Sequence, residues 1–119
     1  RIAQEGSRNP DPNRRMKAVL VLKRVDSDES RQRLQMLMAN DPETAVRKCA
    51  IRALGNNGDR NTLAALKIQL SLLGADVPDL KTFVANLNGE LPDLTLVENV
   101  LLSELIRKSI GKIELRISR

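Results

Sequence analysis

The chain has 119 residues and a formal net charge of +5, with no histidine, tryptophan or tyrosine, one cysteine and one phenylalanine. This length suits one domain, and the missing histidine excludes Ser-His and Cys-His nucleophiles, HExxH sites and imidazole metal ligands. With Phe83 as the sole aromatic residue, the chain lacks the stacking platforms that single-stranded nucleic-acid binders use. We therefore expect neither independent catalysis nor a cofactor or metal ion.

The ends and the apolar runs give expectations about location. Because the chain opens on Arg1 rather than methionine, we expect a processed or excised piece of a longer protein. No apolar run reaches the roughly 18 residues that a membrane-spanning helix needs, so no membrane insertion is expected. A single cysteine cannot form an internal disulfide, which favours a cytoplasmic location.

An internal repeat relates residues 9–38 to residues 41–70 at a constant spacing of 32 positions. Repeats of about 20 to 50 residues are typical of solenoids, in which each unit buries its apolar face by stacking on the next. The expected fold is all-α, an α-solenoid of antiparallel helical hairpins, which offers a surface more readily than a pocket. The coinciding pairs are Arg15 with Arg47, Ala18 with Ala50, Val19 with Ile51, Leu22 with Leu54, Leu34 with Leu66, and Met38 with Leu70.

The first repeat opens with Asn9-Pro10 and predicts two helices joined by a turn over residues 26–30. The acidic group in this turn lacks the regular oxygen spacing of an EF-hand and fits a helix N-terminus, so we assign it no metal. The expected buried stripe of the first helix is Ala18, Val21, Leu22 and Val25, and that of the return helix is Leu34, Leu37 and Met38.

The second repeat has clearer boundaries. Asp41 is the expected N-cap, Pro42 the first helical residue and Gly55 the C-cap, which bounds a helix over residues 42–54. Residues 56–59 form the turn. The return helix is marked by Leu63, Leu66, Leu70 and Leu73.

After the two repeats of residues 1–75, the segment 76–119 is expected to be a degenerate terminal repeat. The proline spacing lengthens here, from 32 positions to the 36 that separate Pro42 from Pro78. A short helix is expected after Pro78, ended by Asn88-Gly89.

A longer helix is expected from Pro92-Asp93 to about Ser109, apolar on two stripes. We expect the first stripe to pack on the repeats and the second to contact a neighbouring molecule or domain. The first stripe is Leu94, Val97, Leu101 and Leu105, and the second is Leu102, Ile106 and Ile110. Beyond it, the alternation of Ile113, Leu115 and Ile117 with polar residues predicts a short strand. Such a strand would pair with another chain, allowing self-association, or lead into a following domain.

The run DPETAVRKCAIRALG at residues 41–55, followed by Gly58-Asp59, resembles the HEAT-like repeats of bacterial proteins, including the phycobilisome-lyase type. The likeness covers residues 9–74 and implies an α-solenoid used mostly for protein binding. In such repeats the arginine and aspartate positions form a ladder that ties neighbouring hairpins together. The resemblance therefore implies framework roles for Arg15, Arg47, Asp41 and Asp59.

The leading function that this resemblance implies is a non-catalytic protein–protein interaction or scaffold module, part of a larger protein or complex. Some HEAT-like proteins bind duplex DNA and some attach bilins, which gives two alternatives. A bilin lyase-like subunit would use Cys49 as a linking thiol, although this residue is expected to be a small buried hydrophobe. Duplex backbone binding would use the basic face of repeat one, with Arg14, Lys17, Lys23 and Arg24 as contacts.

Repeat one is apolar where repeat two is charged, because Met16 and Leu20 correspond to Lys48 and Arg52. This difference is expected if an upstream repeat or a protein partner covers the first helix. The candidate partner-binding residues are Met16, Leu20, Lys17, Lys23, Arg24, Leu102, Ile106 and Ile110.

Overall fold

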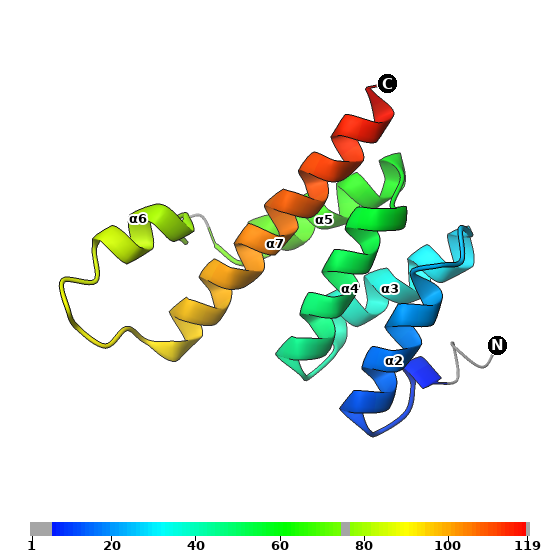
Figure 1. Ribbon diagram of the computed structural model, residues 1–119, viewed down its shortest axis with the longest axis horizontal. Coiled ribbons are helices and arrows are strands. Elements are labelled where there is room, and N and C mark those ends of the chain that lie inside the picture. The colour runs from blue at the N-terminus through cyan, green and yellow to red at the C-terminus, as the bar shows by residue number, and fades with distance from the viewer. Residues whose placement is uncertain (1–5, 75–76, 119) are drawn as a thin grey trace.

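The computed structural model describes residues 6–74 and 77–118, and every regular element in these ranges is a helix, so the all-α prediction is confirmed (Figure 1). The helices are α2 (Pro12–Leu22), α3 (Asp28–Asn40), α4 (Thr44–Asn57), α5 (Arg60–Leu72), α6 (Leu80–Ala85) and α7 (Leu94–Ile117). Within the described part of the chain, no helix is both long and apolar enough to cross a membrane.

The helices are arranged in two layers. Figure 1 shows α2, α4 and α7 side by side in one layer, with α3 and α5 behind them. The molecule is 18 Å deep along its shortest axis, which is close to the depth of two packed helices. The packing of α3 against α4 is more extensive than that of α3 against α2, and α7 packs on both α4 and α5. The strongest contacts therefore join neighbouring units.

Capping residues set where the helices begin. Asp11 caps α2 by accepting from Asn13 N, and Ser27 caps α3 by accepting from Ser30 N. The helices of the two repeats start at Pro12 and Thr44, two residues later than the Pro10 and Pro42 starts that the sequence suggested. The expected N-cap residue Asp41 instead accepts from Glu43 N, in a turn that leads into α4.

Gly55 is not the C-cap that its position suggested, because α4 continues through it to Asn57. A Cβ at Gly55 would lie 2.7 Å from Ser109 Oγ and 3.0 Å from Ser109 Cβ on α7. At this crossing Ser109 Oγ donates to Ile51 O at 2.9 Å. The glycine therefore allows α4 and α7 to approach closely rather than ending a helix.

One core runs between the layers, drawn from the two repeats and α7. Val21 and Val25 were expected in it and are instead exposed, whereas Val19 is buried. Val25 is exposed because α2 ends at Leu22 and the helical period no longer applies beyond it. Val21 is exposed because the buried stripe of α2 runs through Arg15, Ala18, Val19 and Leu22, which leaves Val21 to one side. The core residues are Val19, Leu22, Leu34, Leu37, Met38, Val46, Ala50, Ile51, Ala53, Leu54, Leu66, Leu102, Ile106 and Ile113.

The prediction of a strand after Ser109 is wrong, because α7 continues as one helix of 24 residues to Ile117. Ile113 is 0% exposed and Leu115 is 59% exposed, whereas a strand would place both on one face. The segment is helical because a helix places Ile113 in the core and pairs the backbone N–H and C=O groups within the segment itself.

The assignment of the two stripes of α7 is also wrong. Leu102 and Ile106, which were expected to face a neighbour, are 6% and 2% exposed in the core of this chain, and Ile110 packs partly against the same core. Of the stripe expected to be buried, Leu94 is exposed, and Val97, Leu101 and Leu105 are only half-buried. The cause is that α7 is covered by α4 and α5 together on the side of the second stripe.

The short helix expected after Pro78 is α6, none of whose six residues is buried. Its nearest packing partner is α7, where Glu104 Oε1 accepts from Leu80 N at 3.1 Å. Asn88 and Gly89 have φ values of +50° and +78°, so the expected turn is present. The expected boundary between residues 75 and 76 lies outside the described residues.

Candidate functional site

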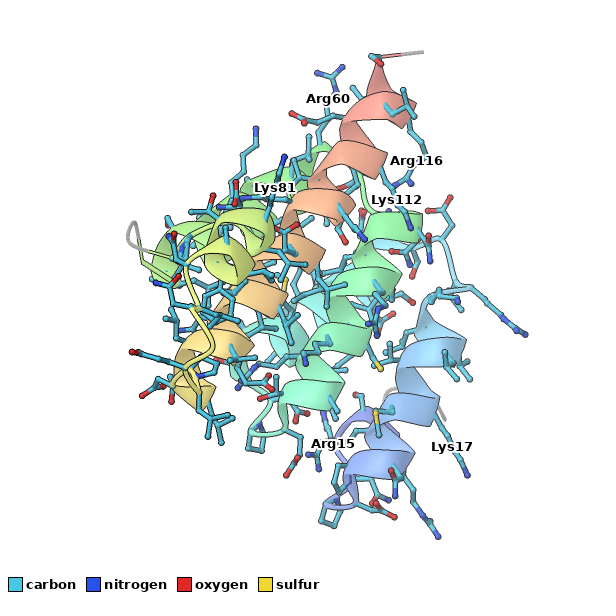
Figure 2. The ribbon with its side chains drawn as sticks, turned by 60° about the vertical axis from the view of Figure 1, so that its left-hand side comes forward. Arg15, Lys17, Arg60, Lys81, Lys112 and Arg116 are labelled. Carbon is cyan, nitrogen blue, oxygen red and sulfur yellow. The ribbon has the colours of Figure 1, made fainter. Side chains whose placement is uncertain are left out.

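A buried ion pair ties the first repeat to the second. Arg15 Nε donates to Asp41 Oδ2 at 2.8 Å and Arg15 Nη2 donates to Asp41 Oδ1 at 3.1 Å. Arg15 Nη1 also donates to the carbonyl oxygens of Asn9 and Pro10. The hydrogen bond with Asp41 raises the pKa of the Arg15 guanidinium, which stays charged. Figure 2 shows Arg15 between the N-terminal ends of α2 and α4, as a framework residue should lie.

Arg47 occupies the equivalent position in the second repeat but has no such partner. Its Nη1 donates to Asp41 O at 3.0 Å and its Nη2 donates to Thr44 Oγ1 at 3.0 Å. The residue that follows Asp41 by 32 positions is Leu73, which carries no carboxylate. The arginine–aspartate ladder of this chain therefore has one complete rung, and Arg47 forms no ion pair within the described residues.

A second polar cluster lies where the turns of the two repeats meet. Arg31 pairs with Asp26 and Asp28 of its own repeat and, through Nε, with Asp59 Oδ2 of the next repeat at 3.3 Å. Burial alone would raise the pKa of Asp59, but hydrogen bonds from Thr62 to its carboxylate hold that pKa below its usual value. Asp59 therefore links neighbouring units, as its framework role required.

The C-terminal ends of α2 and α4 are each closed by the next helix of the front layer. Asn57 Nδ2 donates to Leu22 O and Lys23 O at 3.4 and 3.3 Å. Arg116 Nη1 and Nη2 donate to Gly55 O at 2.7 Å and Gly58 O at 2.8 Å (Figure 2). These donors satisfy carbonyls that a helix leaves without partners. The contact of α7 with the C-terminal end of α4 thus repeats the contact of α4 with the C-terminal end of α2.

Some of the residues on or directly after α2 that were expected to bind a partner are exposed, and the others are half-buried. Lys17, Leu20 and Arg24 are exposed, and Figure 2 shows Lys17 pointing away from the rest of the molecule. Met16 is half-buried against the core, and Lys23 is half-buried at the C-cap of α2. The exposed Val21 and Val25 extend this region. We call Lys17, Leu20, Val21, Arg24 and Val25 the α2 surface.

A groove that sequence reasoning missed lies between α3 and α5. It has a volume of about 460 Å³, and Met36 and Ile68, separated by the repeat spacing of 32, line it at 54% and 58% exposure. The other lining residues are small, apolar or amide-bearing, and none is charged. They are Gln32, Gln35, Met38, Ala39, Asn40, Ala65 and Gln69. We call this space the return-helix groove. The sequence signal for it is the apolar pair Met36 and Ile68, which lie outside the buried stripes of their helices.

Cys49 is half-buried on α4 and packs against the core. This placement agrees with the expected role as a small hydrophobe.

The comparisons with known proteins agree with the repeat geometry. A family model of HEAT repeats matches residues 2–80, which is more than half of the chain. No curated protein and no solved structure matches the chain. The matched range contains both 32-residue repeats and the Arg15–Asp41 rung that joins them. The chain belongs to the HEAT-repeat family.

Proposed function

We propose that this chain is a non-catalytic protein-binding scaffold module, built as an α-solenoid, and that its principal contact surface is the return-helix groove. HEAT repeats generally mediate protein–protein interaction, which supports the class of function. The observation that carries the proposal is the exposure of Met36 and Ile68 at equivalent positions of two stacked repeats.

The chemistry of the groove specifies what a partner must offer. Exposed methionine and isoleucine side chains gain free energy when a partner covers them, and methionine adapts to irregular apolar shapes. The surrounding amides of Gln32, Gln35 and Gln69 can both donate and accept, so they suit the main chain of a partner segment. Because no charged side chain lines the groove, the bound segment should present apolar rather than acidic or basic side chains to it.

Partner capture with matched variants tests this proposal. Met36→Glu combined with Ile68→Glu places charges in the groove without altering the core, because both side chains are more than half exposed. Leu20→Glu, on the α2 surface, is the matched control at 53% exposure. Quantitative mass spectrometry should find proteins that the wild type and the Leu20 variant retain and the groove variant loses. Capture of the same proteins by all three would refute the groove, and selective loss with Leu20→Glu would move the contact to the α2 surface.

The non-catalytic part of the proposal has its own test. Turnover of a defined substrate by this chain alone, sensitive to substitution of a residue within it, would contradict it.

A second candidate, binding to the phosphate backbone of duplex nucleic acid, is favoured by unpaired cations on α2 and directly after it. Lys17 and Arg24 are exposed and form no ion pair with any described residue, while Arg14 comes no closer to Asp11 than 4.0 Å. If these residues and Lys23 contact about four phosphates, the log–log slope of affinity against salt should be about −3 to −4. Absent binding at low salt, or binding that salt does not weaken, would reject this candidate.

A further inference from the structure

A cavity of about 180 Å³ lies at the position where the arginine–aspartate ladder stops. In the first repeat, Arg15 and Asp41 form the complete rung. Adding the repeat spacing of 32 to each residue gives Arg47 and Leu73, and both of these line the cavity. The internal repeat therefore identifies this space as the place where the carboxylate of a second rung would stand.

Three polar side chains in this cavity have unused hydrogen-bonding capacity. Arg47 uses Nη1 and Nη2 in contacts with Asp41 O and Thr44 Oγ1, but its Nε has no acceptor among the described residues. The side-chain amides of Gln69 and Asn99 are half-buried, line the same cavity and have no hydrogen-bond partner in the described part of the chain. None of these atoms is both buried and without a partner, so each one reaches solvent and is available to an acceptor that enters the cavity.

The remaining lining selects the size and character of the ligand. Arg47 is the sole charged residue among those that line the cavity, which therefore matches a single negative charge. The apolar wall suits a short hydrocarbon tail and consists of Met38, Ala39, Ile51, Leu73, Leu102 and Ile106. An arginine side chain recognises a planar carboxylate in particular, because two of its N–H groups can donate in parallel.

We propose that this cavity binds a carboxylate on a short aliphatic chain, with the carboxylate at Arg47 in place of the missing ladder aspartate. The carboxylate can come from a free short-chain acid or from a glutamate side chain of a bound protein, and the two sources present the same group to Arg47. The cavity shares Met38, Ala39 and Gln69 with the return-helix groove between α3 and α5. This inference does not depend on that groove, because it rests on Arg47 and Leu73, which line the cavity but not the groove.

Nuclear magnetic resonance titration of the whole chain tests the proposal with defined probes. Butyrate represents the free acid, and butyramide is its uncharged control. N-acetylglutamate α-amide represents the glutamate side chain. A butyrate titration should shift the Arg47 Nε–Hε signal and the Gln69 and Asn99 amide signals, saturating with a dissociation constant on the order of 1 mM. Binding by butyrate, by the glutamate compound or by both supports the carboxylate site and identifies its source.

Variants connect the binding to the interrupted ladder. Leu73→Asp should supply the missing carboxylate from within the chain and weaken butyrate binding by about tenfold or more. Leu73→Asn, which adds polarity without charge, is its matched control and should retain binding. Arg47→Gln should abolish binding, and Arg47→Lys, which keeps the charge but loses the planar fork, should weaken it. Arg52→Gln alters an exposed arginine of the same helix and should change nothing.

Several results would overturn the proposal. One is the absence of shifts with either carboxylate up to roughly 50 mM, far above the expected dissociation constant. Another is equal binding of butyrate and butyramide, which would show an apolar cavity without carboxylate recognition. Full butyrate binding by a folded Leu73→Asp or Arg47→Lys variant would show that the ladder position is not the site.

Discussion

The close crossing of α4 and α7 makes Gly55 a sensitive position for substitution. Gly55→Ala would place a methyl group 2.7 Å from Ser109 Oγ, 3.0 Å from Ser109 Cβ and 3.1 Å from Ser109 Cα. The last of these atoms belongs to the backbone, so a rotamer change of the serine cannot remove the overlap. The two helices would have to separate at a point where Ser109 Oγ donates to Ile51 O at 2.9 Å.

Two opposing effects set the change in the free energy of unfolding that Gly55→Ala causes. Alanine is favoured over glycine within a helix by about 1 kcal/mol. Overpacking costs about 1–3 kcal/mol, and weakening the hydrogen bond to Ile51 adds about 1 kcal/mol. We expect Gly55→Ala to lower the free energy of unfolding by about 2 kcal/mol. Gly111→Ala is the matched control, because a Cβ at Gly111 in α7 meets nothing within 4 Å and should leave a gain of up to about 1 kcal/mol.

Urea unfolding and thermal melting followed by circular dichroism measure both variants. For a domain of about this size, 1 kcal/mol corresponds to roughly 4 °C or somewhat more in the melting temperature. Gly55→Ala should therefore melt several degrees below the wild type and Gly111→Ala a few degrees above it. A double variant with Ser109→Gly should recover part of the loss beyond additivity. If Gly55→Ala proved as stable as Gly111→Ala, the close crossing would be refuted as the reason for the glycine.

Three further predictions follow from burial and charge. Ile113→Ala should lower the free energy of unfolding by about 2–5 kcal/mol and Leu115→Ala by no more than about 0.5 kcal/mol, measured in urea, and equal losses would contradict the helical end of α7. Because the pKa of Asp59 is lower in the folded than in the unfolded chain, its stabilisation is present above the unfolded value near pH 4 and lost as pH falls through the folded pKa. Unfolding curves measured down to pH 2.5 or so should accordingly show a smaller acid loss for Asp59→Asn than for the wild type, and identical losses would remove Asp59 as a contributor. Asp41→Asn should lower the melting temperature clearly, because it breaks the Arg15 pair, whereas the exposed Glu43→Gln should not, and similar melting of the two variants would argue against the rung.

The sequence predicted the repeats well because their periodicity is reinforced by capping residues and equivalent positions. Asp59 and Thr62 form a complete capping box at the start of α5, close to the expected turn. Leu34 and Leu66, paired by the repeat spacing, are both fully buried. The rung between Arg15 and Asp41 was likewise expected from the family pattern and is present.

The C-terminal region could not be predicted as well, because its pattern is ambiguous without knowledge of its neighbours. The alternation of Ile113, Leu115 and Ile117 fits a strand, but the two-layer packing against α4 and α5 buries Ile113 and leaves Leu115 exposed. Gly55 has the sequence position of a C-cap, and its real role depends on Ser109, which lies 54 residues later in the chain. Contacts over such separations are not visible in a local period. The return-helix groove could not be predicted from the buried stripes of α3 and α5, because its exposed Met36 and Ile68 lie outside those stripes.

The central position of α4 has a consequence for how the molecule opens. This helix packs against α2, α3 and α7, while α2 packs against α3 and α4 at the edge of the front layer. Stability in stacked repeats is a sum of nearest-neighbour terms, so an edge unit can detach while the middle stays folded. Amide hydrogens of α4 should therefore exchange only in the rarest openings, and those of α2 should exchange in smaller, more frequent fluctuations. The helix whose apolar Leu20 and Val21 already face solvent can thus detach at a lower free energy than α4, exposing Val19 and Leu22 for a short time.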